Sequence, residues 1–208
     1  ALYVADGHHR VASAARARAE LAAAGLPTAD ASTFIAVAFP DGDVRIEAEV
    51  ADLLAWCTRE GGAVSVLVNN AGVNLTFDST TMTSDEWDDA FAVDLKAAWL
   101  TAKHAVPAMR TAGRGAIVNV ASIHASATLP GFFPYGAAKA GLVGLTRNMA
   151  LDYGPWGIRV NAVCPGFTRT RLVQESIDRN PDPPAAEAAM VGGVALGRMA
   201  EPAEVASV

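Results

Sequence analysis

Short apolar segments alternate with longer segments of helical spacing along most of the chain, and this alternation is the strongest constraint on its fold. Most of the apolar segments are rich in β-branched residues, which is typical of strands buried in a parallel sheet. They cover residues 1–5, 33–39, 64–68, 116–120 and 158–163. Helical spacing covers residues 9–25, 47–60, 84–111 and 135–153. Because the two kinds of segment alternate, the pattern predicts an α/β fold built on a parallel sheet.

Composition favours a single globular domain over residues 1–208 and excludes several classes of function. Of the 208 residues, 51% are hydrophobic and 18% are charged, and a chain of this length can bury roughly 70% of its unfolded surface. The net charge is −6 and no cluster of Lys and Arg is present, so we expect no nucleic-acid partner. No apolar run reaches the ~18 residues of a membrane span. The opening residues lack the charged region of a signal peptide, which predicts a cytoplasmic protein without a membrane partner.

The two cysteines, Cys57 and Cys164, lie in apolar stretches of the sequence. Two such residues are too few for a disulfide framework or a metal cluster. We therefore expect two buried thiols and no metal.

Two local patterns predict where regular structure begins and where it stops. Thr83 is followed three residues later by Glu86, a pattern in which each side chain caps the other residue's backbone N–H. A helix should therefore begin near Ser84. Residues 180–186 contain three prolines, which argues against regular helix or central strand and predicts a mobile loop.

Tyr135 and Lys139 are four residues apart within a segment of helical spacing, so their side chains should lie on one helix face. An ammonium group beside a phenol favours the phenolate and lowers the pKa of the phenol, as proton transfer near neutral pH requires. The small residues between them leave room for a flat ligand. Taken alone, the pair has a second interpretation, a solvated helix face without chemistry.

Polar or glycine-bearing loops follow three of the predicted strands. Asn69-Asn70-Ala71-Gly72 follows the third strand, Ser122 follows the fourth, and residues 164–170 follow the fifth. The carboxyl ends of parallel strands meet at one edge of a sheet, where open α/β sheets bind ligands. The sequence therefore predicts a binding site at this edge.

From Asp43 onward, the chain resembles the short-chain dehydrogenase/reductase family. The matching residues occur in the family's order and spacing: Asp43-Val44, Asn69-Asn70-Ala71-Gly72, Ser122, Tyr135 with Lys139, Pro165-Gly166 with Thr170, and Gly197-Arg198 before Glu201-Pro202-Ala203-Glu204-Val205. The resemblance implies a doubly wound, Rossmann-like sheet. It also implies an oxidoreductase that transfers hydride between NAD or NADP and a small alcohol or carbonyl substrate.

The resemblance also assigns roles to individual residues. Tyr135 would exchange a proton with the substrate oxygen, which Ser122 would also bind. Lys139 would hold the nicotinamide ribose and lower the pKa of Tyr135. The remaining cofactor contacts would be Asp43 with Val44 at the adenine, Asn69, Ala71 and Gly72 on the adenosine side, and Pro165, Gly166, Thr168 and Thr170 at the carboxamide.

One position departs from the family pattern. Asp94, in Val93-Asp94-Leu95, stands where the family usually has an Asn that supports a water linked to the Lys. Asp94 is therefore a fourth catalytic candidate, which would add a charge beside Lys139. Two histidines are further candidates: His124 has two equal interpretations, a substrate-pocket residue or a plain loop residue, and His104 is expected to be an ordinary helix-face residue.

The first 40 residues differ more strongly from the family. The glycine-rich Thr-Gly-x-x-x-Gly-x-Gly loop is missing, and one β-α unit has no room before Asp43. Instead, Asp6-Gly7-His8-His9-Arg10 resembles a segment of ParB-related proteins, among them free-serine kinases, where it forms an anion site at a helix N-terminus. The alternative interpretation, without any anion binding, is a strand end with two solvated histidines. We interpret the join as a fusion near residues 38–44, with a replaced first β-α unit as the alternative.

These departures set the expected function and its alternatives. The sheet should be incomplete at its N-terminal β-α units and its last strand, and the chain should bind a dinucleotide weakly. The competing functions are a phosphate-binding or phosphotransfer module in residues 1–40 and a catalytically silent fragment. Apolar stripes in two predicted helices indicate a homo-oligomer, a dimer or a tetramer; they consist of Ala98, Ala102, Ala105, Ala108, Ala140, Val143 and Met149.

Overall fold

The computed structural model describes residues 2–5, 34–37 and 46–207 of the chain. These residues fall into two compact units, one ending at Val163 and the other running from Cys164, and each unit is described here by itself. The expectation of a single domain over residues 1–208 concerns how the two units join, and it stays a prediction. The helix predicted over residues 9–25, the Asp6–Arg10 segment and the join near residues 38–44 lie outside the described residues.

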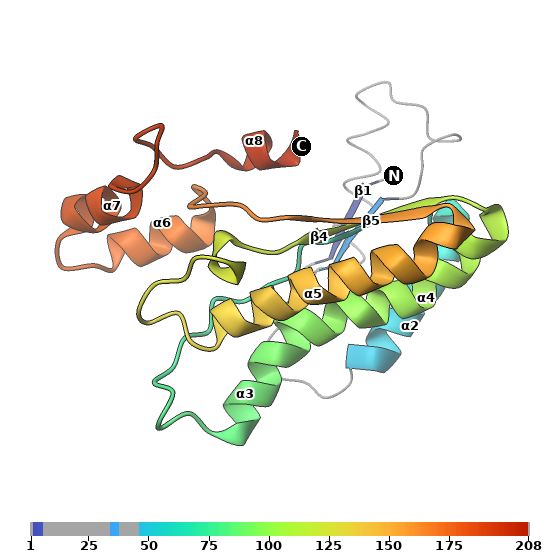
Figure 1. Cartoon of the computed structure of the whole chain (residues 1–208), viewed down its shortest axis with the longest axis horizontal. Helices are drawn as coiled ribbons and strands as arrows, with labels where there is room; N and C mark the ends of the chain where they lie inside the picture. The colour runs from blue at the N-terminus through green and yellow to red at the C-terminus, as the bar shows by residue number, and fades with distance from the viewer. Residues whose placement is uncertain (1, 6–33, 38–45, 208) are drawn as a thin grey trace. The chain divides into compact units, whose positions relative to one another are not determined.

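A five-stranded parallel sheet forms the centre of the first unit (Figure 1). Its strands are β1 (Leu2–Ala5), β2 (Phe34–Val37), β3 (Val66–Asn69), β4 (Gly115–Val120) and β5 (Ile158–Val163). Neighbours in the sheet are also neighbours along the chain, and every pair is parallel. The predicted α/β fold with a parallel sheet is therefore confirmed, and the carboxyl ends of all five strands lie at one edge.

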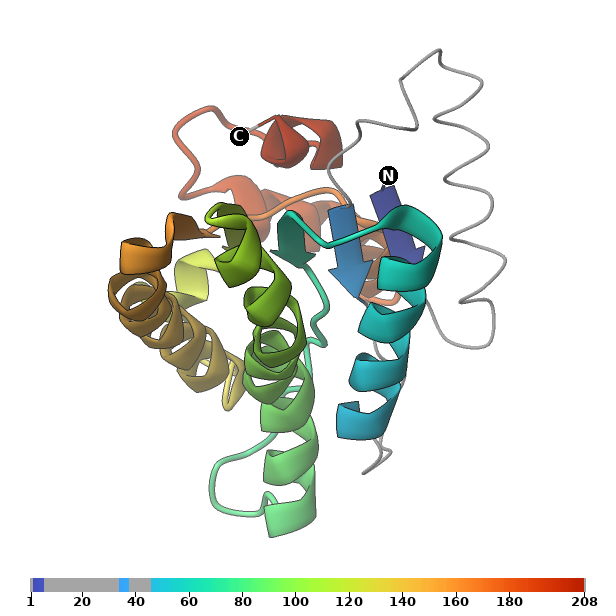
Figure 2. The same ribbon diagram turned by 90° about the vertical axis from the view of Figure 1, so that its right-hand side faces the viewer.

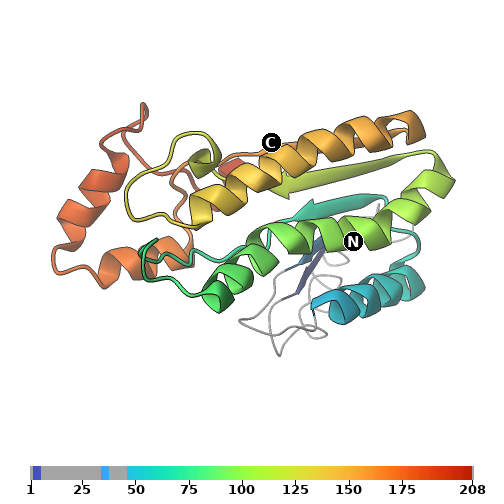
Figure 3. The same ribbon diagram turned by 60° about the horizontal axis from the view of Figure 1, so that its bottom comes forward.

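Three long helices of the first unit lie side by side over one face of this sheet, as Figures 2 and 3 show. They are α2 (Ile46–Gly61), α4 (Ala97–Ala112) and α5 (Tyr135–Tyr153). Short 3-10 turns, η3 (Ile123–Ala125) and η4 (Gly154–Trp156), follow β4 and α5. The start and end of α5 agree with the prediction from helical spacing.

The segment predicted as one helix over residues 84–111 contains a change of helix type. It consists of α3 (Ser84–Phe91), a π-helical segment η2 (Ala92–Lys96) and α4. The predicted start is confirmed, because the Thr83 hydroxyl accepts from the Glu86 N–H at 3.2 Å and the Glu86 carboxylate accepts from the Thr83 N–H at 2.8 Å. Periodicity alone did not predict the π turn, whose hydrogen bonds span one more residue than those of an α-helix.

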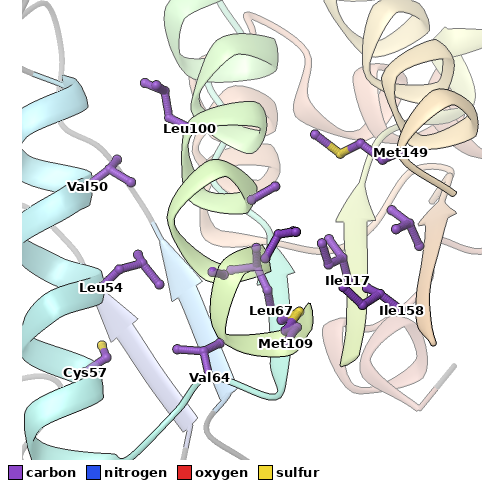
Figure 4. Close-up of a cluster of buried hydrophobic side chains, with 14 residues drawn as sticks. Val50, Leu54, Cys57, Val64, Leu67, Leu100, Met109, Ile117, Met149 and Ile158 are labelled. Carbon is purple, nitrogen blue, oxygen red and sulfur yellow. The ribbon is translucent and has the colours of Figure 1, made fainter. Parts of the chain in front are cut away.

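The hydrophobic core lies between the sheet and these helices (Figure 4). Along the strands every second residue is buried, as in Leu67 on β3, Ile117 on β4 and Ile158 on β5. The helices contribute Val50, Leu54, Cys57, Leu100, Met109 and Met149. Each fully buried side chain of this size contributes about 1.5–3 kcal/mol relative to its exposed state. Cys57 is buried as expected, whereas Cys164 is exposed, so the expectation was wrong for Cys164.

Most of the apolar stripe assigned to subunit contacts is used inside the chain. Ala98, Ala102 and Ala105 on α4 are buried, and so is Met149 on α5. Small side chains at these positions let α4 pack closely on the sheet and on α5. The stripe therefore gives no argument for a homo-oligomer, because the core of one chain already accounts for it.

The second unit contains three short helices: α6 (Arg171–Asp178), α7 (Pro183–Val191) and α8 (Pro202–Ala206). The mobile loop predicted over residues 180–186 was therefore wrong in its second half. Pro183 and Pro184 occupy the first positions of α7, where the missing N–H costs no hydrogen bond and the fixed φ suits a helix. The Asp182 side chain caps this helix by accepting from the Ala185 N–H at 3.1 Å.

Candidate active site

The first turns of α5 place Tyr135 and Lys139 on one face, as their spacing predicts. The Lys139 Nζ lies 5.5 Å from the centroid of the Tyr135 ring. The Lys139 side chain is buried, and its Nζ is 3.5 Å from the carbonyl oxygen of Val120, the last residue of β4. The start of α5 therefore faces the carboxyl end of the sheet.

Ser122 reaches the same place from β4. It is buried, lies two residues after that strand ends, and caps the short turn η3 by accepting from the His124 N–H at 3.2 Å. Its hydroxyl also hydrogen-bonds with the Tyr135 phenol, and this bond lowers the pKa of the phenol. The structure thus brings Ser122, Tyr135 and Lys139 together, and the alternative of a solvated helix face does not fit this burial.

The net effect on Tyr135 is opposite to the one expected. Burial raises the pKa of the phenol above its ordinary value, the hydrogen bond from Ser122 lowers it, and the charge of Asp94 raises it further. The sequence analysis expected Lys139 to lower this pKa. The difference arises mainly because burial disfavours the phenolate, and a negative charge next to Lys139 adds to this effect.

Asp94 supplies that charge. It lies in η2, and its Oδ1 is 3.2 Å from the Lys139 Nζ, with side-chain exposures of 1% for Asp94 and 4% for Lys139. The Val73 N–H donates to the same oxygen at 3.1 Å. Burial raises the pKa of Asp94, while Lys139 and the Val73 N–H lower it. A buried ion pair of this kind is costly to break, because removal of either partner leaves an uncompensated charge.

Gly72 lies directly over this ion pair. A Cβ at this position would lie 3.0 Å from both the Asp94 Oδ1 and the Lys139 Nζ, and the glycine itself is exposed to solvent. Any side chain here would press on the pair and cover it. Glycine therefore lets a ligand approach the backbone above Lys139, as the loop after β3 would require in a cofactor site.

Asn69 and Ala71 occupy the base of the same loop. The Asn69 Nδ2 donates to the Asn119 Oδ1 at 2.8 Å, and the Asn69 Oδ1 accepts from the Thr101 hydroxyl at 2.6 Å. Its side chain is thus occupied by protein partners, which leaves the backbone of this loop for a cofactor. Ala71 lines a small cavity of about 10 Å³, which has room for one water molecule.

A buried polar network lies at the ends of β3 and β4 and was not predicted from the sequence. Asn119 links Asn69 to Thr146 of α5, since its Nδ2 donates to the Thr146 hydroxyl at 2.8 Å. The signal was present, because Asn69 and Asn119 continue the buried alternation that Leu67 and Ile117 begin. A polar residue at a buried strand position requires partners, and here those partners fix α4 and α5 against the strand ends.

Aromatic residues lie beside Tyr135. The His124 ring stacks on Phe132, with centroids 3.9 Å apart, and meets Tyr135 edge to face at 5.8 Å. His124 is buried, and burial lowers its pKa, so the ring is neutral at pH 7. His124 therefore belongs to the neighbourhood of Tyr135. Phe132 is a neighbour that the sequence analysis did not single out, and no pattern marked it.

The other predicted residues belong to other parts of the chain than the group around Tyr135 described above. Asp43 and Val44 are outside the described residues. Pro165, Gly166, Thr168 and Thr170 belong to the second unit, where Thr168 pairs with Ala200 and the Thr170 hydroxyl caps α6. His104 is half-buried on α4. Within the part of the chain that the structure describes, no group of three metal-ligating side chains occurs, and no helix is long and apolar enough to cross a membrane.

A family model described as short chain dehydrogenase matches residues 1–181. The chain belongs to the short-chain dehydrogenase family. The match begins at the first residue, so it includes the segment in which the sequence analysis noted a second resemblance.

Relatives of the chain within this family are oxidoreductases. It is 37% identical over 135 residues to the D-beta-hydroxybutyrate dehydrogenase of Rhizobium meliloti. These residues cover 65% of this chain and 52% of the relative. It is 36% identical over 170 residues to an uncharacterized oxidoreductase of Thermotoga maritima, which is 81% of this chain and 66% of the relative. The chain thus spans about half to two thirds of the length of these relatives.

Solved structures of this family share the fold. The ligand-free aldohexose dehydrogenase of Thermoplasma acidophilum has a TM-score of 0.75 and 28% identity, over 83% of this chain and 74% of that one. A variant of the actinorhodin polyketide ketoreductase, solved with NADPH, has a TM-score of 0.81 and 30% identity, over 99% of this chain and 77% of that one. The Rossmann-like fold expected from the resemblance is therefore confirmed.

Proposed function

We propose that this short-chain dehydrogenase transfers hydride between NAD or NADP and a small molecule that carries an alcohol or carbonyl group. One observation carries the proposal: Ser122, Tyr135 and Lys139 converge beside an exposed glycine at the carboxyl end of the sheet. A hydroxyl pair that shares a hydrogen bond can hold one substrate oxygen, and the phenol can exchange a proton with it.

The nicotinamide cofactor supplies or accepts the hydride when it is bound. The residues present fit such a group, because Gly72 leaves open the space over Lys139 that a Cβ would fill. In this proposal Lys139 would hold the ribose, the backbone of Asn69, Ala71 and Gly72 would line the adenosine side, and Asp43 with Val44 would contact the adenine. The family resemblance would assign the carboxamide of the cofactor to Pro165, Gly166, Thr168 and Thr170.

The protein's own part in the reaction is to hold the substrate oxygen and to move one proton. The Ser122 hydroxyl donates to that oxygen, which positions it against the Tyr135 phenol. Tyr135 then donates its proton during reduction or accepts one during oxidation. His124 and Phe132 form an aromatic wall beside this position, which suits a substrate with an apolar surface next to its reacting carbon.

Fluorescence titration with NADH and with NADPH tests cofactor binding. The lack of a glycine-rich loop makes weak binding the expected result, so the titration should extend to millimolar concentrations. Lack of binding in that range would contradict the proposal.

Turnover with a panel of alcohols and ketones tests the chemistry. We expect Tyr135→Phe to lose activity by about 100-fold or more, the usual contribution of a proton-transfer group, while dinucleotide binding is retained. Tyr153→Phe is the matched control, because Tyr153 lies at the far end of α5 and stacks on Trp156. Equal turnover by Tyr135→Phe and the unmodified chain would refute the role of Tyr135.

A further inference from the structure

We propose that Asp94 is a positioning residue that neutralises Lys139 and so keeps the Tyr135 phenol protonated, which makes this site a proton donor suited to carbonyl reduction rather than alcohol oxidation. This inference rests on the proposed function and extends it, since that proposal does not choose a direction.

The carboxylate of Asp94 is held in a buried position beside Lys139. Asp94 and Lys139 are both almost fully buried, and their charged atoms are 3.2 Å apart. The Val73 N–H also donates to the Asp94 Oδ1, which holds the carboxylate next to Lys139. Lys139 therefore does not present a free positive charge to its surroundings.

The Lys139 ammonium also lies near the Tyr135 ring. The Lys139 Nζ is 5.5 Å from the Tyr135 ring centroid, close enough for a lone ammonium to stabilise the phenolate strongly in a buried site. A carboxylate paired with that ammonium cancels most of this attraction and adds its own repulsion. In agreement with this, burial and the charge of Asp94 both raise the pKa of Tyr135.

Other charges near the pair are turned outward. On α3, next to η2, Asp85, Asp88 and Asp89 are exposed, and Glu86 is engaged in the helix cap. Lys96 of η2 is exposed. On α4, Lys103 is exposed and pairs with Glu47, and His104 is half-buried. His124 of η3 is neutral at pH 7. Arg147 and Asp152 of α5 are exposed. Among the described residues of the first unit, Asp94 and Lys139 are thus the charged side chains that are buried.

Spectroscopic titration of the chain without cofactor tests this inference. Phenolate absorbance is followed against pH, and a Tyr135→Phe variant is subtracted to remove the other two tyrosines. In Asp94→Asn, whose amide keeps the shape of the carboxyl group, we expect Tyr135 to ionise at lower pH than in the unmodified chain. Asp89→Asn on α3 is the matched control, because this exposed carboxylate should leave the titration unchanged.

A second variant guards against misfolding of the first. Lys139→Met leaves the carboxylate of Asp94 without its partner, so Tyr135 should ionise at higher pH than in the unmodified chain. Opposite shifts in the two variants support the inference. If Asp94→Asn folds and its Tyr135 titrates as in the unmodified chain, or if the two variants shift in the same direction, the inference is overturned.

The catalytic consequence is measured separately. With a substrate pair in hand, Asp94→Asn should raise the ratio of the kcat of oxidation to the kcat of reduction at fixed pH, while the ratio of the two kcat/KM values stays fixed by the equilibrium. Its oxidation profile should move to lower pH. A chain that shows the spectroscopic shifts but binds no dinucleotide would refute the proposed function and leave the electrostatic role of Asp94 standing. A chain that turns over normally but lacks the shifts would do the reverse.

Discussion

At the scale of single residues, the site depends on what is missing from Gly72. Most of its neighbours act through the hydrogen bonds that their side chains make. Gly72 matters because it has no side chain, since a Cβ at this position would collide with Asp94 and Lys139. Close packing makes such positions sensitive to a single methyl group.

Gly72→Ala should therefore disturb the ion pair. The added methyl group has to push the Asp94 Oδ1 or the Lys139 Nζ by a few tenths of an ångström, and overpacking of this kind costs about 1 kcal/mol or more. We expect a lower free energy of unfolding in urea and weaker binding of NADH. Gly144→Ala on α5 is the control: a Cβ there meets nothing within 4 Å, and alanine in place of a helical glycine should stabilise by about 0.5–1 kcal/mol. Equal stability of both variants would argue against a strained Gly72 site.

At the scale of secondary structure, the ends of helices explain both a confirmed prediction and a wrong one. Thr83 and Glu86 form the expected reciprocal cap at the start of α3. Residues 180–186 were expected to be a loop because of their prolines, yet two of these prolines open α7. A proline inside a helix removes one backbone hydrogen bond, as Pro107 does in α4, whereas a proline in the first turn removes none. Position relative to a capping residue such as Asp182 decides between the two outcomes.

The start of α8 gives a pH-dependent test in the second unit. Glu204 accepts from the Glu201 N–H and pairs with Arg198 at 2.7 Å, and the hydrogen bond from Arg198 is the largest cause that lowers the pKa of Glu204 to about 2. A folded-state pKa below the ordinary 4.5 means that this contact stabilises the fold above about pH 4.5. Its contribution is lost as the pH falls toward 2.

Carboxyl NMR measures this titration directly. The Glu204 resonance should reach its midpoint near pH 2 in the unmodified chain and shift well upward in Arg198→Gln. A Glu204 midpoint that ignores the loss of Arg198 would show that the ion pair does not form in solution.

At the scale of the whole molecule, the order of strands and helices could be predicted from the sequence because burial imposes its period on every element. The predicted bounds of β5 and α5 agree with the structure. Side-chain partners were harder to predict. The Asn69–Asn119–Thr146 network joins residues that are distant in sequence and that meet only when β3, β4 and α5 have packed. The effect of Asp94 on Tyr135 likewise depends on burial, which residue spacing does not reveal.

Exposed apolar side chains on α4 and α5 concern the oligomeric state of the chain. We still expect a homo-oligomer, although the alanine stripe no longer supports it, because Trp99 on α4 and Leu151 on α5 are 42% and 77% exposed. Light scattering at micromolar concentration should give a multiple of the 21.5 kDa chain mass. Trp99→Ala should shift the mass toward the monomer, and Leu172→Ala in the second unit serves as a comparison. A monomer for the unmodified chain would refute the expectation.

The π-helical segment η2 between α3 and α4 sets how α3 is rotated about the helix axis relative to α4. An α-helix turns by about 100° per residue, so the residue accommodated in Ala92–Lys96 offsets the face of α3 from the face of α4 by about that angle. Deleting one residue from this segment would let the rod continue as an ordinary α-helix. The same deletion would rotate the carboxylate of Asp94 away from Lys139, or else rotate α3 away from its contacts. A continuous α-helix and the ion pair between Asp94 and Lys139 thus exclude one another. The extra residue in Ala92–Lys96 favours the ion pair.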